Sequence, residues 1–592
     1  MNEPQTKICQ NCRGSFTIEA DDFSFYEKMK VPPPTWCPEC RLIRRLMRRN
    51  ERSLYKRICN LCDKEKISMF PQSSPYTVYC TDCWRSDNWD GMNYGRDYDF
   101  SKPFFAQWHE LLLTTPRYGI IQQGENVDSE YTNRANSNRG CYHIFASSRN
   151  EYCRYGTWFI DSLDSMDCYG VQKSEQCYGC IDCFQCYDLL FSQECNTCRS
   201  SAFLFNCRNC TNCFGCVNMR NAKYCIFNTQ YSKEEYDAKL KSYNLSNYVV
   251  LADLRNKFTT FRRAFIVPWS VVHHAVDSSG NWLEDCKNTR ESFNCRDTED
   301  VRYGQSLFET KDAMDFSNWG QGSERIYECI NVGIQSAGIK FSTECWVQAM
   351  DNTYCMNCET SKNLFGCISL RKKQYCILNK QYSKEEYETL IPQIMRHMDA
   401  MPYADSKGRV YKYGEYYPPE LCQFAYNESI AQEYFPLSKE QVIAAGYPWK
   451  DQEAKTYTIT KKPEELPRIG DAQDSIKDEV IGCEHKGLCN DQCTTAFRII
   501  SDELQFYRKR NLPLPTLCPN CRHYERLRQR TPLKLWHRSC RCAGKKSVGD
   551  MYQNTASHFH GEGHCPNKFE TSYAPDRPEI VYCEQCYQAE VA

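Results

Sequence analysis

Cys177-Tyr-Gly-Cys180-Ile-Asp-Cys183-Phe-Gln-Cys186 has a cysteine at every third position, and this spacing decides how the middle of the chain folds. From Cys141 to Cys225 the cysteines are separated only by multiples of three residues, and no residue of that register up to Asn228 is charged. A strand repeats its inward face every two residues, whereas a narrow solenoid with short sides and corners can repeat it every three. A narrow axis admits Cys, Ser, Ala and Gly, and Cys behaves there as a small hydrophobic residue. The register therefore predicts a β-solenoid with cysteines inside.

Two other interpretations of the inner cysteines stay open. A polyproline-type helix also has a period of three, but its recurring residue would be glycine, which is not the case here. A column of thiolates could chelate soft metals or take part in thiol exchange. Core packing is the expectation that needs no further ligand.

A second copy of the solenoid follows the first. Cys213-Phe-Gly-Cys216 returns as Leu364-Phe-Gly-Cys367, 151 residues later, and the following residues match as far as Tyr387. In the second copy the period slips between Gly322 and Cys355, which predicts a bulge or loop there. Each copy ends in Ser-Lys-Glu-Glu, at Ser232 and Ser383, and this capping box predicts a helix that closes the end of the solenoid.

These patterns predict a mainly β protein with small α content, in which two tandem cysteine-rich β-solenoid repeats are flanked by duplicated treble-clef or zinc-ribbon modules. Residues 101–113 read as a helix expected to cover the opening of the first solenoid. The expected domains are a zinc module with two sites (1–85), a linker with this capping helix (86–125), the first solenoid with its end helix (126–245), a connector (246–281), the second solenoid with its end helix (282–400), a second connector (401–480) and a second zinc module with two sites (481–592).

Paired cysteines near both ends predict metal sites. A Cys-x2-Cys turn directs two thiolates to one ion, and a second pair completes a closed tetrahedral shell, typical of structural Zn²⁺. Four pairs in each module therefore predict about four zinc ions in all. We group the pairs sequentially, and a cross-braced grouping, or reduced cysteines without metal, are the alternatives. The predicted ligands are Cys9, Cys12, Cys37, Cys40, Cys59, Cys62, Cys80, Cys83, Cys489, Cys493, Cys518, Cys521, Cys540, Cys542, Cys583 and Cys586.

The two end modules are copies of each other. Phe25-Tyr26 matches Phe506-Tyr507, and Cys-Pro-x-Cys-Arg stands in both at the same distance from the next pair. The C-terminal copy departs from the pattern at Cys489-x3-Cys493 and Cys540-x-Cys542, while Cys422, Cys483 and Cys565 belong to neither pattern and read as buried residues or spare ligands. Its insert His558-Phe-His560-Gly-Glu-Gly-His564 could hold a transition metal or replace a zinc ligand, the alternative being loop histidines without metal.

Arginines follow the second pair of each module at helical spacing. Between residues 41 and 57 there are eight Lys and Arg against one Glu, a density suited to neutralising phosphates. The alternative is that these arginines pair with acids of a neighbouring domain. The predicted nucleic-acid contacts are Arg41, Arg44, Arg45, Arg48, Arg49, Arg52, Lys56, Arg57, Arg522, Arg526, Arg528 and Arg530.

Composition bounds the compartment and the partners. The 592 residues include 41 cysteines, yet the N-terminus has no apolar signal-like stretch and no run is long enough to cross a membrane. We therefore expect a cytoplasmic protein with reduced thiols and no membrane contact. The net charge of −1 is the sum of basic ends and an acidic middle, so a polyanion would meet the ends first.

The chain resembles a group of uncharacterised multi-zinc-ribbon, cysteine-repeat proteins of uncultivated bacteria. In the probable zinc-ribbon domain of that group Cys-x2-Cys, Phe-Tyr, Pro and Cys-x2-Cys-Arg follow in order, matched here by Cys9, Cys12, Phe25-Tyr26, Pro34, Cys37, Cys40 and Arg41. The likeness extends over most of the chain, through the Cys-Phe-Gly-Cys stretch to residues 426–437. It implies the architecture and zinc at both ends, and it implies no reaction.

Three functions are compatible with these patterns. The leading hypothesis is a zinc-binding, non-enzymatic nucleic-acid-binding protein, with RNA or the ribosome favoured and the solenoids as a rigid spacer. The alternative is a protein-interaction scaffold that uses the solenoid flank, and a thiol- or metal-handling protein comes third. The sequence contains no phosphate-binding glycine loop, serine-nucleophile elbow or HExxH motif, so an enzymatic role is open but less expected.

Overall fold

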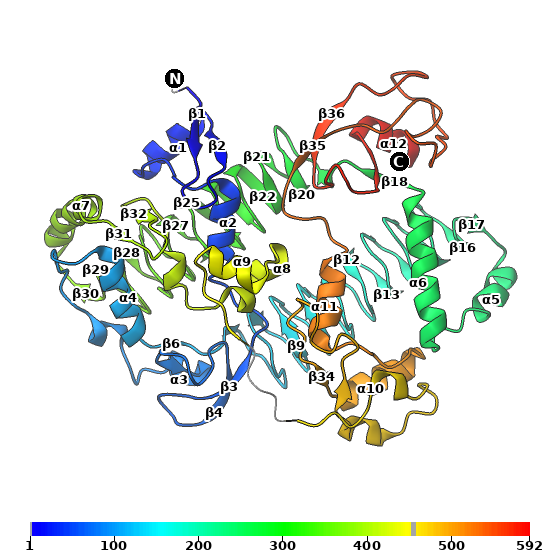
Figure 1. Ribbon diagram of the computed structural model, residues 1–592, viewed down its shortest axis with the longest axis horizontal. Helices are drawn as coiled ribbons and strands as arrows, with labels where there is room; N and C mark the ends of the chain where they lie inside the picture. Colours follow the sequence, from blue (N-terminus) through cyan, green and yellow to red (C-terminus); the bar gives the residue numbers. More distant parts are fainter. Residues whose placement is uncertain (1–2, 452–456, 592) are drawn as a thin grey trace. The chain divides into compact units, whose positions relative to one another are not determined.

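The computed structural model describes residues 3–451 and 457–591, and it shows a mainly β protein made of two compact units. One unit comprises Met1–Ile120 and Ser270–Asp451, and the other comprises Ile121–Trp269 and Gln452–Ala592 (Figure 1). The first unit thus combines the N-terminal cysteine-rich module with the second solenoid, and the second unit combines the first solenoid with the C-terminal module. None of the described helices is both long enough and apolar enough to cross a membrane.

The cysteine-rich part of the first unit contains two hairpins, and further along the chain from each lies a helix with a cysteine at its N-cap, α2 after the first and α3 after the second. Its antiparallel pairs are β1 with β2 and β3 with β4, while β5 pairs in parallel with β6. Its elements are β1 (Gln5–Ile8), β2 (Ser15–Ile18), α1 (Asp22–Met29), α2 (Pro38–Leu46), β3 (Tyr55–Ile58), β4 (Glu65–Ser68), β5 (Val78–Tyr79), α3 (Thr81–Arg85), η1 (Gly91–Tyr94), α4 (Phe104–Thr114) and β6 (Arg117–Tyr118).

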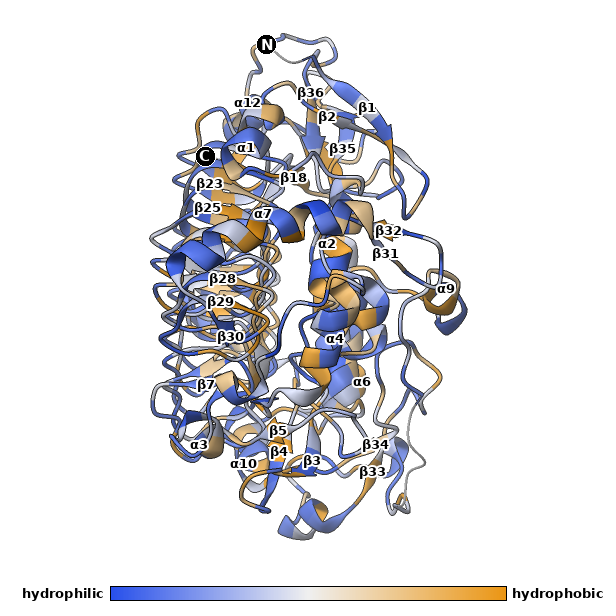
Figure 2. Ribbon diagram, turned by 90° about the vertical axis from the view of Figure 1, so that its left-hand side faces the viewer, coloured by the Kyte–Doolittle hydropathy of each residue, from blue (hydrophilic) through white to orange (hydrophobic). Residues whose placement is uncertain are grey.

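The second solenoid occupies most of the same unit. Its parallel strands stack turn upon turn, and Figure 2 shows β23, β25, β28, β29 and β30 in succession along the stack. They are β19 (Val272–His273), β20 (Gly280–Glu284), β21 (Lys287–Arg290), β22 (Ser292–Arg302), β23 (Phe308–Met314), β24 (Gly320–Gln321), β25 (Ser323–Tyr327), β26 (Gly333–Ile334), β27 (Ala337–Lys340), β28 (Lys362–Phe365), β29 (Gln374–Ile377) and β30 (Lys380–Gln381).

The predicted slip in this solenoid is real. Thr298 pairs with Thr310, which gives a turn of twelve residues, but Thr310 pairs with Ser323 and Ala337 with Met350, which gives turns of thirteen. The twelve-residue spacing returns between Met350 and Lys362. One extra residue per turn displaces the inward register, which is why the period of three fails in this part of the sequence.

Connector elements and the end helix complete the first unit. Ser383 caps α7 in a capping box with Glu386, as predicted. These elements are α7 (Lys384–Ala400), β31 (Tyr403–Ala404), β32 (Val410–Tyr411), η2 (Pro419–Leu421), η3 (Tyr426–Glu428), α8 (Ile430–Tyr434) and α9 (Lys439–Ala444).

Helix α4 forms at the place that the sequence predicts, but it covers a different solenoid. Its Phe104 ring lies 5.2 Å from that of Tyr354 and 5.3 Å from that of Phe365, both in the second solenoid. Trp108, fully buried, lies 4.4 Å from the ring of Tyr417. The expectation that residues 101–113 close the first solenoid is therefore wrong. The expectation rested on adjacency in sequence, whereas the aromatic partners of α4 come about 250 to 310 residues later.

The first solenoid makes up the core of the second unit. Its turns have twelve residues: Cys213 pairs with Cys225 and Val171 with Cys183. Its strands are β7 (Gln122–Gln123), β8 (Ala135–Asn136), β9 (Tyr142–Phe145), β10 (Arg154–Thr157), β11 (Tyr169–Gln172), β12 (Ile181–Phe184), β13 (Tyr187–Leu190), β14 (Arg199–Ala202), β15 (Thr211–Phe214), β16 (Lys223–Ile226) and β17 (Thr229–Gln230).

Helices and the C-terminal module pack around this solenoid. The capping box predicted at Ser232 is present and begins α5. The remaining elements are α5 (Lys233–Lys241), α6 (Tyr248–Arg263), β18 (Ile266–Pro268), η4 (Pro463–Glu465), η5 (Asp474–Asp478), β33 (Ile481–Gly482), β34 (Ala496–Phe497), α10 (Ser501–Arg510), α11 (Pro519–Leu527), β35 (Trp536–Ser539), β36 (Lys568–Thr571), β37 (Ile580–Tyr582) and α12 (Glu584–Val591).

The backbone explains the period of three. In the first solenoid nearly every third residue has a φ of about +45 to +60°, and each such residue directly precedes an inward one, as Asn209 precedes Cys210. Two extended residues and one left-handed residue form each short side and its corner. Asn, Asp and Gly adopt the left-handed region most readily, and they occupy many of the corners.

The inward register is confirmed. The inner cysteines of the first solenoid are at most 2% exposed and form one apolar cluster. Their thiols donate to backbone carbonyls: Cys180 Sγ lies 3.5 Å from the oxygens of Tyr178 and Leu189. In the second solenoid, burial raises the pKa of Cys295 and of Cys329 to about 12. Buried thiols that donate to backbone carbonyls are packing groups, in agreement with the core-packing interpretation.

Candidate metal centres and their arginine anchors

Four groups of cysteines have the geometry of closed metal sites. In the N-terminal module the thiols of Cys9, Cys12, Cys37 and Cys40 lie within 4.8 Å of one another, and so do those of Cys59, Cys62, Cys80 and Cys83. This is the sequential grouping that the spacing predicts. In each site one pair comes from the turn of a hairpin, β1–β2 or β3–β4, and the other from the first turn of a helix, α2 or α3.

The two C-terminal groups use different residues from those predicted. One comprises Cys483, Cys493, Cys518 and Cys521, and the other comprises Cys540, Cys565, Cys583 and Cys586. Cys483 thus stands in place of the predicted Cys489, and Cys565 in place of the predicted Cys542. Cys489 remains a neighbour, with its sulfur 3.7 Å from that of Cys521.

This difference arises because the C-terminal module has insertions in the hairpin turns that carry the first cysteine pair of each site. The amide of Cys9 donates to Gly14 O across a tight turn, whereas the amide of Cys483 donates to Thr495 O and that of Cys540 to Asn567 O. The second ligand of each C-terminal pair is therefore separated from the first by a loop. Cysteine spacing alone favours a cysteine inside each loop over the true ligand at one end of it: Cys489 over Cys483 at the start of the first loop, and Cys542 over Cys565 at the end of the second.

A shared hydrogen bond shows that the four sites are built alike. In each, the first cysteine of the helical pair donates its amide to the sulfur of the first hairpin cysteine. The distances are 3.3 Å from Cys37 N to Cys9 Sγ, 3.2 Å from Cys80 N to Cys59 Sγ, 3.3 Å from Cys518 N to Cys483 Sγ and 3.2 Å from Cys583 N to Cys540 Sγ. An amide donor at sulfur favours the thiolate, the form that binds metal.

Helix α2, which begins at the first of these sites, and the residues that follow it turn their arginines inward. The predicted phosphate contacts Arg41, Arg44, Arg45, Arg48 and Arg49 are at most 2% exposed. In Figure 2 much of the ribbon of α2 has the colour of hydrophilic residues. A buried guanidinium needs an ion pair or hydrogen bonds to offset its desolvation.

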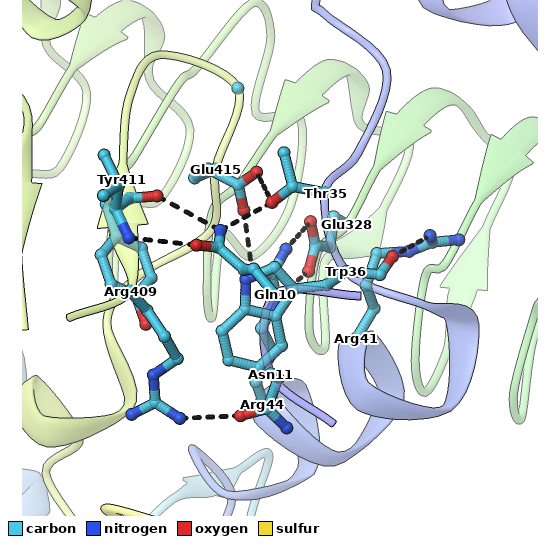
Figure 3. A network of polar contacts seen from close by, with 12 residues as sticks. Gln10, Asn11, Thr35, Trp36, Arg41, Arg44, Glu328, Arg409, Tyr411 and Glu415 are labelled. Atoms are coloured by element: carbon cyan, nitrogen blue, oxygen red, sulfur yellow. Dashed lines mark hydrogen bonds and ion pairs between the residues drawn. The ribbon is translucent and has the colours of Figure 1, made fainter. Parts of the chain in front are cut away.

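Asp315 of the second solenoid is the partner of two of these arginines. Its carboxylate accepts from Arg41 Nε at 2.5 Å and lies 3.3 Å from Arg45 Nη1. Arg44 forms a two-pronged pair with Glu328 at 2.5 and 2.6 Å and reaches Glu415 at 3.2 Å, as Figure 3 shows. Burial raises the pKa of Glu328, and Arg44 opposes that shift.

The second unit repeats this anchor. Arg522 and Arg526 of α11 occupy the places of Arg41 and Arg45 in the duplicated module, and both pair with Asp167 of the first solenoid, at 2.5 and 3.0 Å. Asp167 is 2% exposed. The role predicted for these arginines thus differs from the one that the structure gives them: in this conformation they hold a helix of the cysteine-rich module on a solenoid.

The other predicted phosphate contacts divide between interior and surface. Arg48 stacks 4.5 Å from the ring centre of Tyr417. Arg49 pairs with Glu51 at 2.5 Å, and Arg57 donates to Pro71 O at 2.6 Å. Arg52 is buried, and Arg530 pairs with Asp182 at 2.7 Å. Of the predicted contacts only Lys56 and Arg528 are exposed.

Comparison with known proteins adds little to this geometry. No protein-family model matches the chain, and no curated protein matches it. Among solved structures, the chain is similar to a "putative acetyltransferase" from Desulfovibrio desulfuricans G20, with 8% identity over 47% of this chain and 83% of that chain. The TM-score is 0.10, which carries no argument about function.

Proposed function

We propose that the protein is a zinc-stabilised, non-enzymatic binding scaffold that presents the exposed flank of its solenoids to a protein partner. Four thiolates around each site leave no position for water or substrate, which suits structural zinc. The resemblance to multi-zinc-ribbon proteins agrees with zinc in this role.

The position of the arginines is the observation that carries the proposal. Nine of the twelve side chains expected to neutralise phosphate are buried, and the best placed of them serve the attachment of a zinc module to a solenoid. Nucleic-acid binding draws its affinity from many accessible cations. A protein partner does not need many accessible cations, so the scaffold is the better supported of the two hypotheses.

The flank of the first solenoid offers a continuous surface for such a partner. Eight residues stack on successive turns through parallel bridges, with a rise of about 4.8 Å per turn, and we call them the flank ladder. Leu163 and Tyr187 are 36% and 41% exposed there. The ladder mixes three basic residues with two acidic ones, a pattern suited to a protein surface of mixed charge. Its members are Arg139, Glu151, Leu163, Glu175, Tyr187, Arg199, Thr211 and Lys223.

Crosslinking in cells with the full-length protein, with and without nuclease, tests the proposal. A recovered partner is then purified and its affinity measured for the native protein and for the Leu163→Ser/Tyr187→Ser variant. The proposal predicts a nuclease-resistant partner whose affinity falls at least tenfold. A matched control, Gln185→Ser/Asn196→Ser, changes two exposed residues outside the ladder and should leave the affinity unchanged.

The same material tests the nucleic-acid alternative. If defined RNA or DNA binds tightly at physiological salt, with a steep salt dependence that Lys56→Ala/Arg528→Ala flattens, the scaffold proposal is overturned in favour of nucleic-acid binding. Partners that disappear with nuclease would point the same way.

A further inference from the structure

The loop inserted between Cys540 and Cys565 brings a second set of metal-ligating side chains beside the fourth cysteine site. Potential ligand atoms of Cys542, His558, His560 and Cys586 lie within 4.8 Å of one another. Cys542 and Cys586 are fully buried. His564, which the sequence placed in the same cluster, is exposed and is absent from this group.

Each histidine has one ring nitrogen within hydrogen-bond distance of an oxygen acceptor, which leaves the lone pair on the other nitrogen. Nε2 of His558 lies 3.0 Å from Glu590 Oε1, and both side chains are at most 1% exposed. Its Nδ1 is buried and has no hydrogen-bond partner among the described residues. A carboxylate that accepts from one nitrogen, and so presents the lone pair of the other, is the usual support of a metal-bound histidine.

His560 is oriented in the same way. Its Nδ1 lies 3.0 Å from Gly563 O, a carbonyl that can only accept, so this nitrogen carries the proton. Nε2 then carries the lone pair, and it is within hydrogen-bond distance of Cys586 Sγ, at 3.4 Å. Two imidazole nitrogens and two sulfurs lie within 4.8 Å of one another, and they are the donor set of a tetrahedral Cys2His2 zinc site.

The supports of the cluster are themselves fixed. Glu590 of α12 also accepts from the amides of Thr555 and Ala556, which ties the inserted loop to the helix that carries Cys586. Asn554 donates to Cys542 Sγ at 3.3 Å and to Gly544 O at 2.5 Å. These bonds hold the ligands in place from outside the cluster.

We propose that the inserted loop forms a fifth metal site, in which Cys542, His558, His560 and Cys586 bind a zinc ion. Cys586 also belongs to the fourth cysteine site. Its thiolate therefore bridges two ions, which makes this end of the chain a binuclear centre. The second Zn²⁺ brings two positive charges and only one additional thiolate, so it lessens the negative charge of the four-thiolate site.

Metal content of the full-length protein tests this site. We expect about five zinc ions per chain in the native protein, about four in His558→Ala/His560→Ala, and about five in the matched control His564→Ala. X-ray absorption at the zinc edge should show a nitrogen shell at about 2.0–2.1 Å beside the sulfur shell at about 2.3 Å. The double variant should lose the nitrogen shell.

Two results would overturn the proposal: four zinc ions in the native protein with sulfur ligands only, or an unchanged zinc count and nitrogen shell in the double variant. If the double variant fails to fold, the spectrum of the native protein alone tests the site. The absence of a nitrogen shell there would contradict the proposal. The four cysteine sites are counted in the same experiment, so failure of the fifth site is distinguishable from failure of the structural-zinc proposal.

Discussion

Asp315 and Asp167 hold equivalent positions in the two solenoids, and each is buried beneath two arginines of a helix that begins at a cysteine site. Arg41 and Arg45 meet Asp315, and Arg522 and Arg526 meet Asp167. The duplication therefore preserved an attachment as well as a fold. In each half a cysteine site fixes the first turn of the helix, and the arginines that follow fix the helix to the solenoid.

Removal of the charge of Asp315 should destabilise the first unit. In Asp315→Asn two buried guanidinium groups lose their shared counter-charge, and breaking a buried pair in this way costs about 3–5 kcal/mol. Urea unfolding followed by hydrogen exchange in residues 38–46 and 308–327 measures the effect where it arises. The matched control is Asp312→Asn, because Asp312 pairs with Lys28 at the surface and such pairs contribute about 0–1 kcal/mol. Equal stability of the two variants would contradict the anchor.

The inner register predicts different outcomes for two changes at Cys195. Cys195→Asp places a carboxylate on a narrow apolar axis with no cation beside it, so we expect a loss of at least about 3 kcal/mol in the free energy of unfolding. Cys195→Ser should cost far less, because Ser147 occupies the same column and donates to Phe145 O at 2.7 Å. The midpoint of denaturant unfolding distinguishes the two. An unchanged midpoint for Cys195→Asp would show that the side chain does not point inward.

The left-handed corners predict a position-dependent response to valine. Ser200 has a φ of +45° and is exposed, so Ser200→Val should cost about 1–2 kcal/mol, since a β-branched residue is strained there. Ser200→Gly should be neutral or stabilising. The neighbouring Arg199→Val lies on an extended residue and should be tolerated. Thermal melts of the three variants give the comparison, and a tolerated valine at Ser200 would be inconsistent with the corner conformation.

Periodicity and spacing predicted the solenoids, the two capping boxes and the N-terminal cysteine groups, because each depends on residues close in sequence. Cys483 and Cys565 could not be chosen in this way, since a loop separates each from its partner. An alignment of the two modules on the strands that flank the cysteine turns, instead of on cysteine spacing, could have found them.

Whether these arginines are buried in ion pairs or exposed to solvent depends on tertiary contacts. A helix with arginine on several faces has the same pattern whether phosphate or buried carboxylates meet it. Asp315 and Glu328 lie nearly 300 residues away, in the solenoid more distant along the chain, and no local signal marks them as partners. For the same reason, replacing Arg44, Arg45, Arg48 and Arg49 together would test folding rather than nucleic-acid binding.

The central claim is that metal sites fix the arginine helices on the solenoids. Hydrogen exchange in Cys37→Ser/Cys40→Ser tests this claim most directly. The account predicts that this variant loses one zinc ion. It also predicts that amides of α2 and of residues 314–328 lose protection together, while the first solenoid keeps its protection. An unchanged zinc count, or a lost zinc with full protection of α2 and of residues 314–328, would contradict the account.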